Sequence, residues 1–158
     1  MTGFTFKNTL SAGLKKYKDL ANMEGNEGAD FRAKSQVALQ FLNVCDNGSA
    51  KEPVVPPIKT GNLRGSASVF VGPIMVQTTR GRYGIGKPAT SCPEKMNIIT
   101  LVWNTAYAAK MHEDTWEPGP VSEQSGDVGN KWCERHMIAD GPDLLELYAI
   151  IFKKETGG

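Results

Sequence analysis

The residues that could do chemistry in this sequence are its two histidines, its three cysteines and the acids beside them. Cys133 and His136 are three residues apart, and on a helix this spacing would place two metal ligands on one face. His112 could supply a third ligand, whereas Glu113 and Asp114 follow it directly and would point in other directions from a regular element. One hypothesis is therefore a small metal-dependent hydrolase, and the alternative is a buried cysteine beside a half-exposed histidine.

No other arrangement in the sequence has the form of a catalytic site. The nucleophile motif Gly-x-Ser-x-Gly does not occur, and GIGKP is not a phosphate-binding loop because Pro88 stands where such a loop has serine or threonine. Because the chain has only two histidines and no convincing acid–base pair, we predict that it is not an enzyme. The prediction includes no catalytic residues, no metal and no cofactor.

Positive charge collects in one glycine-rich segment. The segment contains Arg80, Arg82, Tyr83 and Lys87, and its only acid is Glu94. A flexible basic loop with an aromatic ring could contact a phosphate backbone, so these four residues are candidates for contact with DNA. The alternative is a mobile hairpin tip that its charges keep soluble.

The three tryptophans are expected to occupy different environments. Trp103 ends a predicted strand and Trp132 opens a predicted helix, and tryptophan at such positions is usually part of the core. Trp116 instead lies in DTWEPGP, a proline- and glycine-rich segment that is typical of a surface loop. Because tryptophan is enriched where proteins meet, Trp116 is predicted to lie at an interface.

The segment VPPIKTGNLRGSASVFV changes the chain from helix to strand. Pro56 and Pro57 favour an extended backbone and end the helical region before them. After a tight turn, Leu63 is predicted to enter the core and Arg64 to point away from it. An arginine presented at such a fixed place is suited to a subunit contact, and the alternative is a corner whose arginine is only solvated.

Helices are predicted at both ends of the chain, because apolar residues recur there at helical spacing. The N-terminal third has one apolar face at Leu10, Leu14, Tyr17 and Ala21, and a second at Phe31, Ala38, Leu42 and Cys45. Asp30 is predicted to cap the second helix, and Asp143 to cap a final helix that follows a stop at Gly141 and Pro142. The first two helices would form an α-hairpin or one long interrupted helix.

The middle of the chain changes to the residue types of β-strands. SASVFV, GPIMVQTT and NIITLVWNT are rich in β-branched and aromatic residues, and Pro73 predicts a bulge, a bend or an edge. We therefore predict an α+β fold, with an antiparallel sheet of about three to five strands packed against about three to four helices and a long hairpin loop. The prediction is one domain over residues 1–158, with a helical part at 1–50, a sheet-rich part at 60–110 and a helical part at 126–155.

Composition excludes several broad classes. The net charge of +1 indicates no preference of the whole molecule for nucleic acid or for a membrane surface. The N-terminus does not have the layout of a signal peptide, and no apolar run is long enough to span a membrane, so we expect synthesis in a cytoplasm and no membrane partner. Three well-separated cysteines argue against a disulfide framework.

Three segments together resemble one family. PPIKTGNLRGSASV is similar to the P-x-x-T-G-x-L-R-x-S segment of the minor capsid and head–tail connector (neck) proteins of tailed bacteriophages. VWNTAYAAKMHED and GNKWCERHM resemble two further stretches of that family in the same order, over roughly residues 50 to 140. The matching positions in these two stretches are Asn104, Tyr107, Ala108, His112, Glu113, Gly129, Lys131, Trp132 and Glu134.

The resemblance implies a structural virion protein without catalysis. Family members form a homo-oligomeric ring at the portal vertex, in the neck of the virion, and this ring joins the portal and adaptor proteins to the tail around the DNA channel. The expected partners are copies of the chain, the portal and adaptor proteins, and tail-terminator or tail-tube proteins. The chain would be made in the host cytoplasm. Two alternatives remain open, a tail-completion or tail-terminator ring protein and a general DNA-binding module.

Residues of this chain can be assigned to the surfaces that such a ring needs. Arg64 on one flank is expected to pair with Glu113 or Asp114 of the next subunit, with Tyr107 and Trp116 also at the interface. The four residues of the basic loop, Arg80, Arg82, Tyr83 and Lys87, are expected to face the channel and to make non-specific contact with packaged double-stranded DNA.

Overall fold

The fold is built around a small antiparallel sheet. The computed structural model describes residues 25–57, 61–93, 98–123 and 128–158. Within these ranges the strands are β1 (Ala67–Val71), β2 (Ile74–Thr78) and β3 (Ile99–Trp103). The sheet has the order β2-β1-β3, so β1 is the central strand and pairs with a neighbour on each side. The α+β class and the three strands predicted from the sequence are confirmed.

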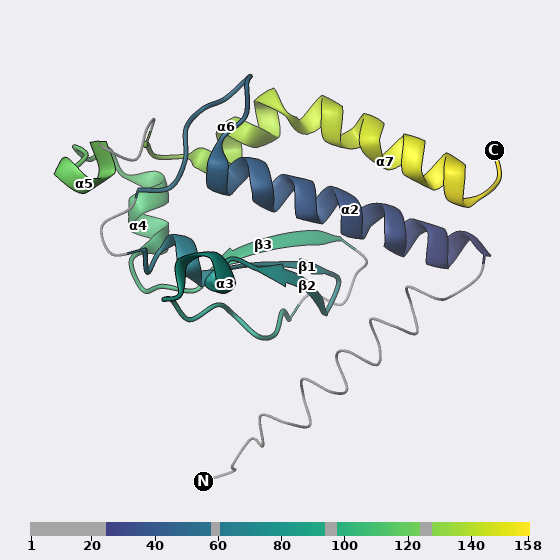
Figure 1. Ribbon diagram of the computed structural model, residues 1–158, viewed down its shortest axis with the longest axis horizontal. Coiled ribbons are helices and arrows are strands. Elements are labelled where there is room, and N and C mark those ends of the chain that lie inside the picture. The colour runs from purple at the N-terminus through teal and green to yellow at the C-terminus, as the bar shows by residue number, and fades with distance from the viewer. Residues whose placement is uncertain (1–24, 58–60, 94–97, 124–127) are drawn as a thin grey trace, which may run out of the picture.

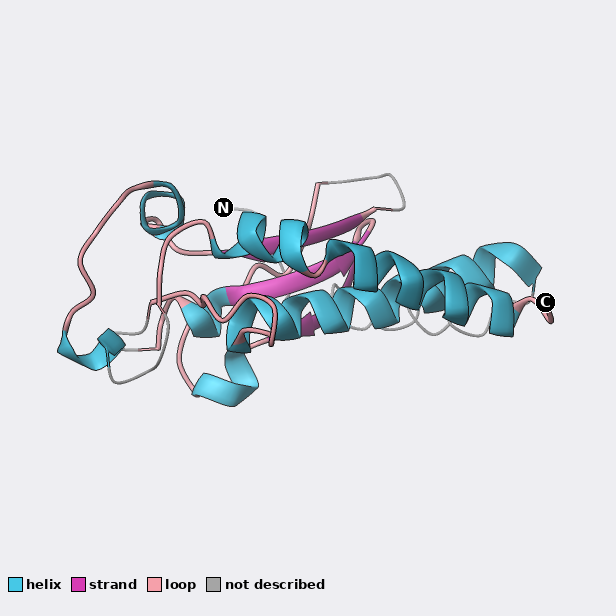
Figure 2. Cartoon of the chain, turned by 90° about the horizontal axis from the view of Figure 1, so that it is seen from above, coloured by secondary structure: helices cyan, strands magenta, loops and turns pink. Residues whose placement is uncertain are grey.

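Helices cover one face of the sheet and lie at one of its ends (Figure 1 and Figure 2). The long helix α2 lies between the sheet and the C-terminal helix α7, and α4 and α5 lie at one end of the molecule (Figure 1). No helix within the described ranges has both the length and the apolar character needed to cross a bilayer. The helices are α2 (Gly25–Asn47), α3 (Arg80–Tyr83), α4 (Ala108–Glu113), α5 (Pro120–Glu123), α6 (Trp132–Ala139) and α7 (Gly141–Glu155), with a 3-10 turn η1 at Arg64–Ser66.

The main core forms between α2 and β1. The predicted apolar stripe on α2 is confirmed, because all four of its residues are buried and Phe31, Ala38 and Leu42 pack on the sheet. Alternate residues of a strand face the same side, and accordingly Ala67, Val69 and Val71 of β1 meet this stripe. The other two residues of β1, Ser68 and Phe70, are also fully buried, so the second face of the sheet is covered too. The earlier apolar face, at Leu10 to Ala21, lies outside the described residues.

The second face is covered by residues 80–93, the crossing segment, which follow β2. The prediction of a hairpin loop there is wrong, because β2 and β3 lie on opposite edges of the sheet and the chain must cross β1 to join them. Figure 1 shows the part after α3 passing on the side of the sheet away from α2. Ser68 Oγ donates a hydrogen bond to the Ala89 carbonyl (2.8 Å), and Asn104 Nδ2 donates one to the Lys87 carbonyl (2.9 Å). These bonds hold the crossing segment in place.

The crossing segment approaches η1 so closely that only glycine fits. A Cβ atom added to Gly65 would lie 1.8 Å from the Ile85 carbonyl oxygen, and one added to Gly86 would lie 2.4 Å from the backbone of Gly65. Both glycines thus serve the contact between two backbones, and neither is a sign of a mobile loop tip. The sequence suggested such mobility because glycine content alone does not distinguish the two roles.

We expect Gly65→Ala to lower the free energy of unfolding by about 1–3 kcal/mol, because the methyl group would push the crossing segment off the sheet. Urea denaturation followed by circular dichroism measures the change. Gly81→Ala is the matched control, since a Cβ at Gly81 meets nothing within 4 Å. Equal stability of the two variants would contradict the close approach at Gly65.

Three local predictions have mixed outcomes. Pro73 forms, with Gly72, the two-residue turn between β1 and β2, which confirms the predicted bend. The prediction that Asp30 caps α2 is wrong, because the helix already begins at Gly25. Asp143 likewise lies inside the first turn of α7, and Asp140 precedes the helix. Both helices therefore begin before the acid that was predicted to cap them.

Candidate subunit interface and the polar cluster beside it

The three segments that carry the family resemblance meet at one corner of the molecule. Leu63, Ala108 and Trp132, one from each segment, form a buried cluster. Trp132 is only 1% exposed, as expected for a core tryptophan. The rings of Trp103 and His112 meet its indole edge to face, at centroid distances of 5.9 Å and 4.7 Å. Segments that are far apart in the sequence therefore build a common support.

An open groove of about 780 Å³ lies beside this cluster. Its lining includes Leu63, Tyr107, Met111, Trp116 and Val121, so two of the predicted interface residues share one surface. Tyr107 is 41% exposed and Val121 is 51% exposed, and these apolar groups face solvent in the single chain. Trp116 is half-buried, and its Nε1 donates a hydrogen bond to the Met111 carbonyl (2.8 Å). The indole is thus held in a defined position at the groove.

The predicted acidic partners lie nearby at the end of α4. Glu113 is exposed and contacts His112 Nδ1 at 2.7 Å and Lys131 Nζ at 3.2 Å. The interaction with His112, and then that with Lys131, lowers the pKa of Glu113. Lys131 also pairs with Glu134 (3.0 Å). Glu113 therefore already has partners within its own chain, whereas Asp114 is exposed next to it.

Arg64 does not lie where the sequence predicted. Its side chain was expected to point away from the core, but the residue is only 8% exposed and its Nε donates a hydrogen bond to the Pro56 carbonyl (2.7 Å). The prediction is wrong because the residues before the turn fold back over the arginine, so the guanidinium binds backbone of its own chain. Arg64 is therefore a structural residue of the corner and is not available to a carboxylate of a neighbouring subunit.

Two residues of the basic segment converge on one buried acid. Asp46, near the end of α2, has a side chain that is 2% exposed. Arg82 Nη1 donates to its Oδ2 at 2.8 Å, and the Tyr83 hydroxyl lies 3.0 Å from both carboxylate oxygens. Burial raises the pKa of Asp46, and the hydrogen bonds from Tyr83 and Arg82 oppose that rise. Of the four residues predicted to face DNA, Arg80 and Lys87 are exposed and lie outside this cluster, whereas Arg82 is bound to Asp46 although its side chain is 52% exposed.

Asp46 was overlooked in the sequence, although a signal was present. It follows Leu42 by four residues and therefore continues the apolar face of α2. An acid on a buried helical face needs a partner, because an unpaired buried charge is costly. The sequence could have pointed to a buried polar contact at this position, but it could not identify Arg82 and Tyr83, which are 36 and 37 residues away, as the partners.

The candidate metal ligands of the alternative hypothesis, His112, Cys133 and His136, do not form a metal site in this arrangement. His136 is fully buried, with Nδ1 2.6 Å from Asp140 and Nε2 2.9 Å from the Val54 carbonyl, so both ring nitrogens are engaged. Cys133 and the buried Cys45 are both free thiols, and the contact with Cys133, together with burial, raises the pKa of the Cys45 thiol. Among the residues that the structure describes, no group of three His, Cys, Asp or Glu side chains could hold a metal ion.

The corner therefore has two parts, a groove with exposed apolar side chains and a polar cluster around the buried carboxylate of Asp46 that fixes the crossing segment. No model of a known protein family matches this sequence, and no characterised protein or solved structure was found to be similar to it. The geometry of the corner and the resemblance of its three segments are accordingly the basis for proposing a function.

Proposed function

We propose that this chain is a structural subunit of the neck of a tailed bacteriophage, a head–tail connector protein that forms a homo-oligomeric ring around the DNA channel. One observation carries the proposal. The three segments that resemble the neck family fold into one cluster, at Leu63, Ala108 and Trp132, directly beside a groove with exposed apolar residues. A subunit that must bind copies of itself needs such a surface, because a ring interface joins two different flanks of the same chain.

The proposed interface is smaller than the one expected from the sequence. Tyr107 and Trp116 belong to the groove, and the acidic end of α4 at Glu113 and Asp114 lies near it. Arg64 has no part in it because it is buried. Contact with packaged DNA is proposed for Arg80 and Lys87 alone, since Arg82 and Tyr83 are bound to Asp46.

Ring formation can be observed directly. Mass photometry and cryo-electron microscopy of the purified chain, alone and mixed with particles of the virus that carries it, should show closed rings at the portal vertex. A ring at the far end of the tail tube would favour a tail-terminator role. A chain that stays monomeric and does not join particles would overturn the proposal.

We expect Tyr107→Asp to weaken ring assembly by about thirty-fold, the effect of losing about 2 kcal/mol at a central interface residue. The fold should persist because Tyr107 is 41% exposed. The measurement is the concentration of half-assembly, with circular dichroism as the check on folding. Ile150→Asp is the matched control, since Ile150 is also exposed (58%) but lies on α7 outside the groove. Equal assembly of both variants would exclude this groove from the interface.

A further inference from the structure

One pair of polar side chains at the end of α6 is buried, although both groups can carry a charge. His136 is 0% exposed, and Asp140, one turn later, is 6% exposed. His136 Nδ1 lies 2.6 Å from Asp140 Oδ2, and His136 Nε2 lies 2.9 Å from the Val54 carbonyl oxygen. The Ser49 hydroxyl donates a hydrogen bond to the same Asp140 oxygen (3.0 Å). The pair therefore joins the end of α6 to the segment that follows α2.

The partners of His136 fix the number of protons that the pair holds. A carbonyl oxygen only accepts hydrogen bonds, so Nε2 must carry a hydrogen that points to Val54. If Nδ1 and the Asp140 carboxylate were both without a proton, two lone pairs would face each other across 2.6 Å. One further proton therefore lies between the two groups, and it belongs to the pair whichever atom carries it.

Loss of that shared proton breaks one of the two contacts of the ring. A neutral imidazole has a single N–H, whereas two acceptors face this ring. The N–H can bind Asp140 and leave Val54, or it can bind Val54 and turn a lone pair toward the carboxylate. A hydrogen bond to a buried charged group is worth more than one to a carbonyl, so the bond to Val54 is the one that is lost.

The segment held through Val54 supports the groove of the proposed interface. Val54 packs against the buried cluster that contains Trp132, and the Val55 carbonyl accepts a hydrogen bond from the Gly129 amide (3.2 Å). Two residues further on, Pro57 lines the groove itself. Release of Val54 would therefore loosen one wall of that groove.

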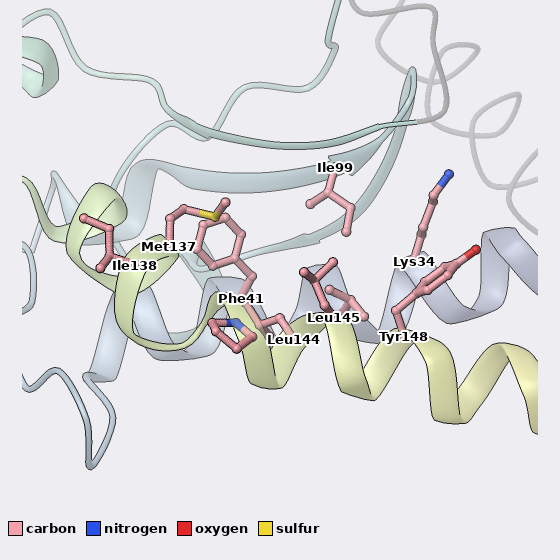
Figure 3. Close-up of a pocket in the computed structure, with 11 residues that line it drawn as sticks. Lys34, Phe41, Ile99, Met137, Ile138, Leu144, Leu145 and Tyr148 are labelled. Carbon is pink, nitrogen blue, oxygen red and sulfur yellow. The ribbon is translucent and has the colours of Figure 1, made fainter.

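A second groove, of about 730 Å³, borders α6 and α7 (Figure 3). Met137 and Ile138, which follow His136 directly, are 54% and 75% exposed there, and Leu145 of α7 lines it as well. Asp140 stands between the two helices, as the C-cap of α6 and the N-cap of α7. The pair of His136 and Asp140 therefore also fixes the junction at which the lining of this groove meets.

The other charged groups on the elements around the pair have partners of opposite charge. They are the ion pairs Asp46–Arg82, Glu52–Arg135 and Lys51–Asp143, which involve α2, the segment after it, α6 and α7. Two thiols, Cys45 and Cys133, lie on α2 and α6. Contact with Cys133, burial and then the charge of Asp140 raise the pKa of the Cys45 thiol, which therefore keeps its proton. We attribute a pH effect at this place to the proton shared by His136 and Asp140.

We propose that His136 and Asp140 form a proton-dependent latch, which holds the segment from Val54 to Pro57 while the shared proton is bound and releases it when the proton leaves. The sign follows from the geometry, because the closed latch contains one proton more than the open one, so raising the pH opens it. The wall of the groove thereby responds to pH. The latch works within a single chain and does not depend on ring formation.

Nuclear magnetic resonance of the chain with ¹⁵N-labelled histidine tests the latch, since the sequence contains only two histidines. The ring nitrogens of His136 report the loss of the proton, and hydrogen exchange reports the protection of the Gly129 amide, which is bound to Val55. We expect this protection to fall at least about tenfold as the pH rises, with the same midpoint as the titration of His136. Unchanged protection of Gly129 while His136 loses its proton would overturn the proposal.

Two matched variants separate the latch from a general effect of pH. Asp140→Asn keeps both contacts without a shared proton, because its amide N–H can donate to Nδ1 of a neutral ring whose Nε2–H binds Val54, so the protection of Gly129 should no longer depend on pH. Asp143→Asn is the control, since this exposed acid pairs with Lys51 outside the latch, and it should leave the pH dependence unchanged. A pH dependence that persists in Asp140→Asn would contradict the latch. If a variant does not fold, the two midpoints in the unaltered chain still decide the question.

Discussion

Replacing Trp132 by alanine is expected to lower the free energy of unfolding by about 3–5 kcal/mol, the usual cost of deleting a buried tryptophan ring. Trp132 is 1% exposed and joins the three segments of the corner, since it packs with Leu63 and Ala108 and meets the rings of Trp103 and His112. No neighbouring side chain can fill the space that the indole leaves, because these contacts come from separate elements. The variant should also lose ring assembly.

Urea denaturation followed by far-ultraviolet circular dichroism measures this loss without relying on tryptophan fluorescence. Trp132→Phe should cost less than Trp132→Ala, because phenylalanine keeps an aromatic ring and removes an indole N–H that has no hydrogen-bond partner among the described residues. Trp116→Ala is the control at a half-buried tryptophan, and we expect it to cost about 1 kcal/mol through the hydrogen bond to Met111. A loss below 1 kcal/mol for Trp132→Ala would show that the corner is not a rigid support.

Replacing Asp46 by alanine is expected to cost about 3 kcal/mol, because it leaves Arg82 and Tyr83 without their shared acceptor and removes a buried charged partner. The crossing segment should loosen at the same time, since these two residues lie in α3, the helix with which that segment begins. Thermal unfolding and hydrogen exchange of residues 80–93 measure the two effects. Arg80→Ala is the control on the same helix, at an exposed residue outside the cluster. Unchanged exchange in Asp46→Ala would contradict the anchoring role.

The pH dependence of the same site has a definite sign. Burial raises the pKa of Asp46 above its ordinary value of 3.8, so the folded state holds the proton more tightly than the unfolded chain. As the pH rises from 3.8 toward the raised value, the unfolded carboxyl ionises first and the native state loses stability. The stability of the unaltered chain relative to Asp46→Asn should therefore fall across this window and stay constant above it. A relative stability that rises there would show that the ion pair with Arg82 outweighs burial.

The contrast between α2 and Arg64 shows how far local patterns extend. The stripe at Phe31, Ala38, Leu42 and Cys45 was predicted because each residue of a helix turns by a constant angle, so spacing alone reveals which side is buried. The environment of Arg64 depends on Pro56, whose carbonyl accepts a hydrogen bond from its Nε, and spacing along one element does not report such a contact. Its burial therefore required the tertiary structure.

The basic segment was misinterpreted for a related reason. Charge and glycine content at residues 79–94 suggested a mobile loop, because composition describes how a segment would behave without partners. The partners are Asp46, the backbone at Gly65 and the hydroxyl of Ser68, all of which come from other parts of the chain. They are close only because the order β2-β1-β3 forces the segment to cross the central strand.

By itself the sequence determined the α+β class, the three strands and the buried face of α2, because helix and strand geometry translate residue spacing directly into burial. It also identified Tyr107 and Trp116, which the fold brings to one groove. Only the tertiary structure decided the strand order, the burial of Arg64 and the binding of Arg82 and Tyr83 to Asp46. Those outcomes depend on which distant segments pack together, and the free energy of such packing belongs to the pair of segments and not to either one alone.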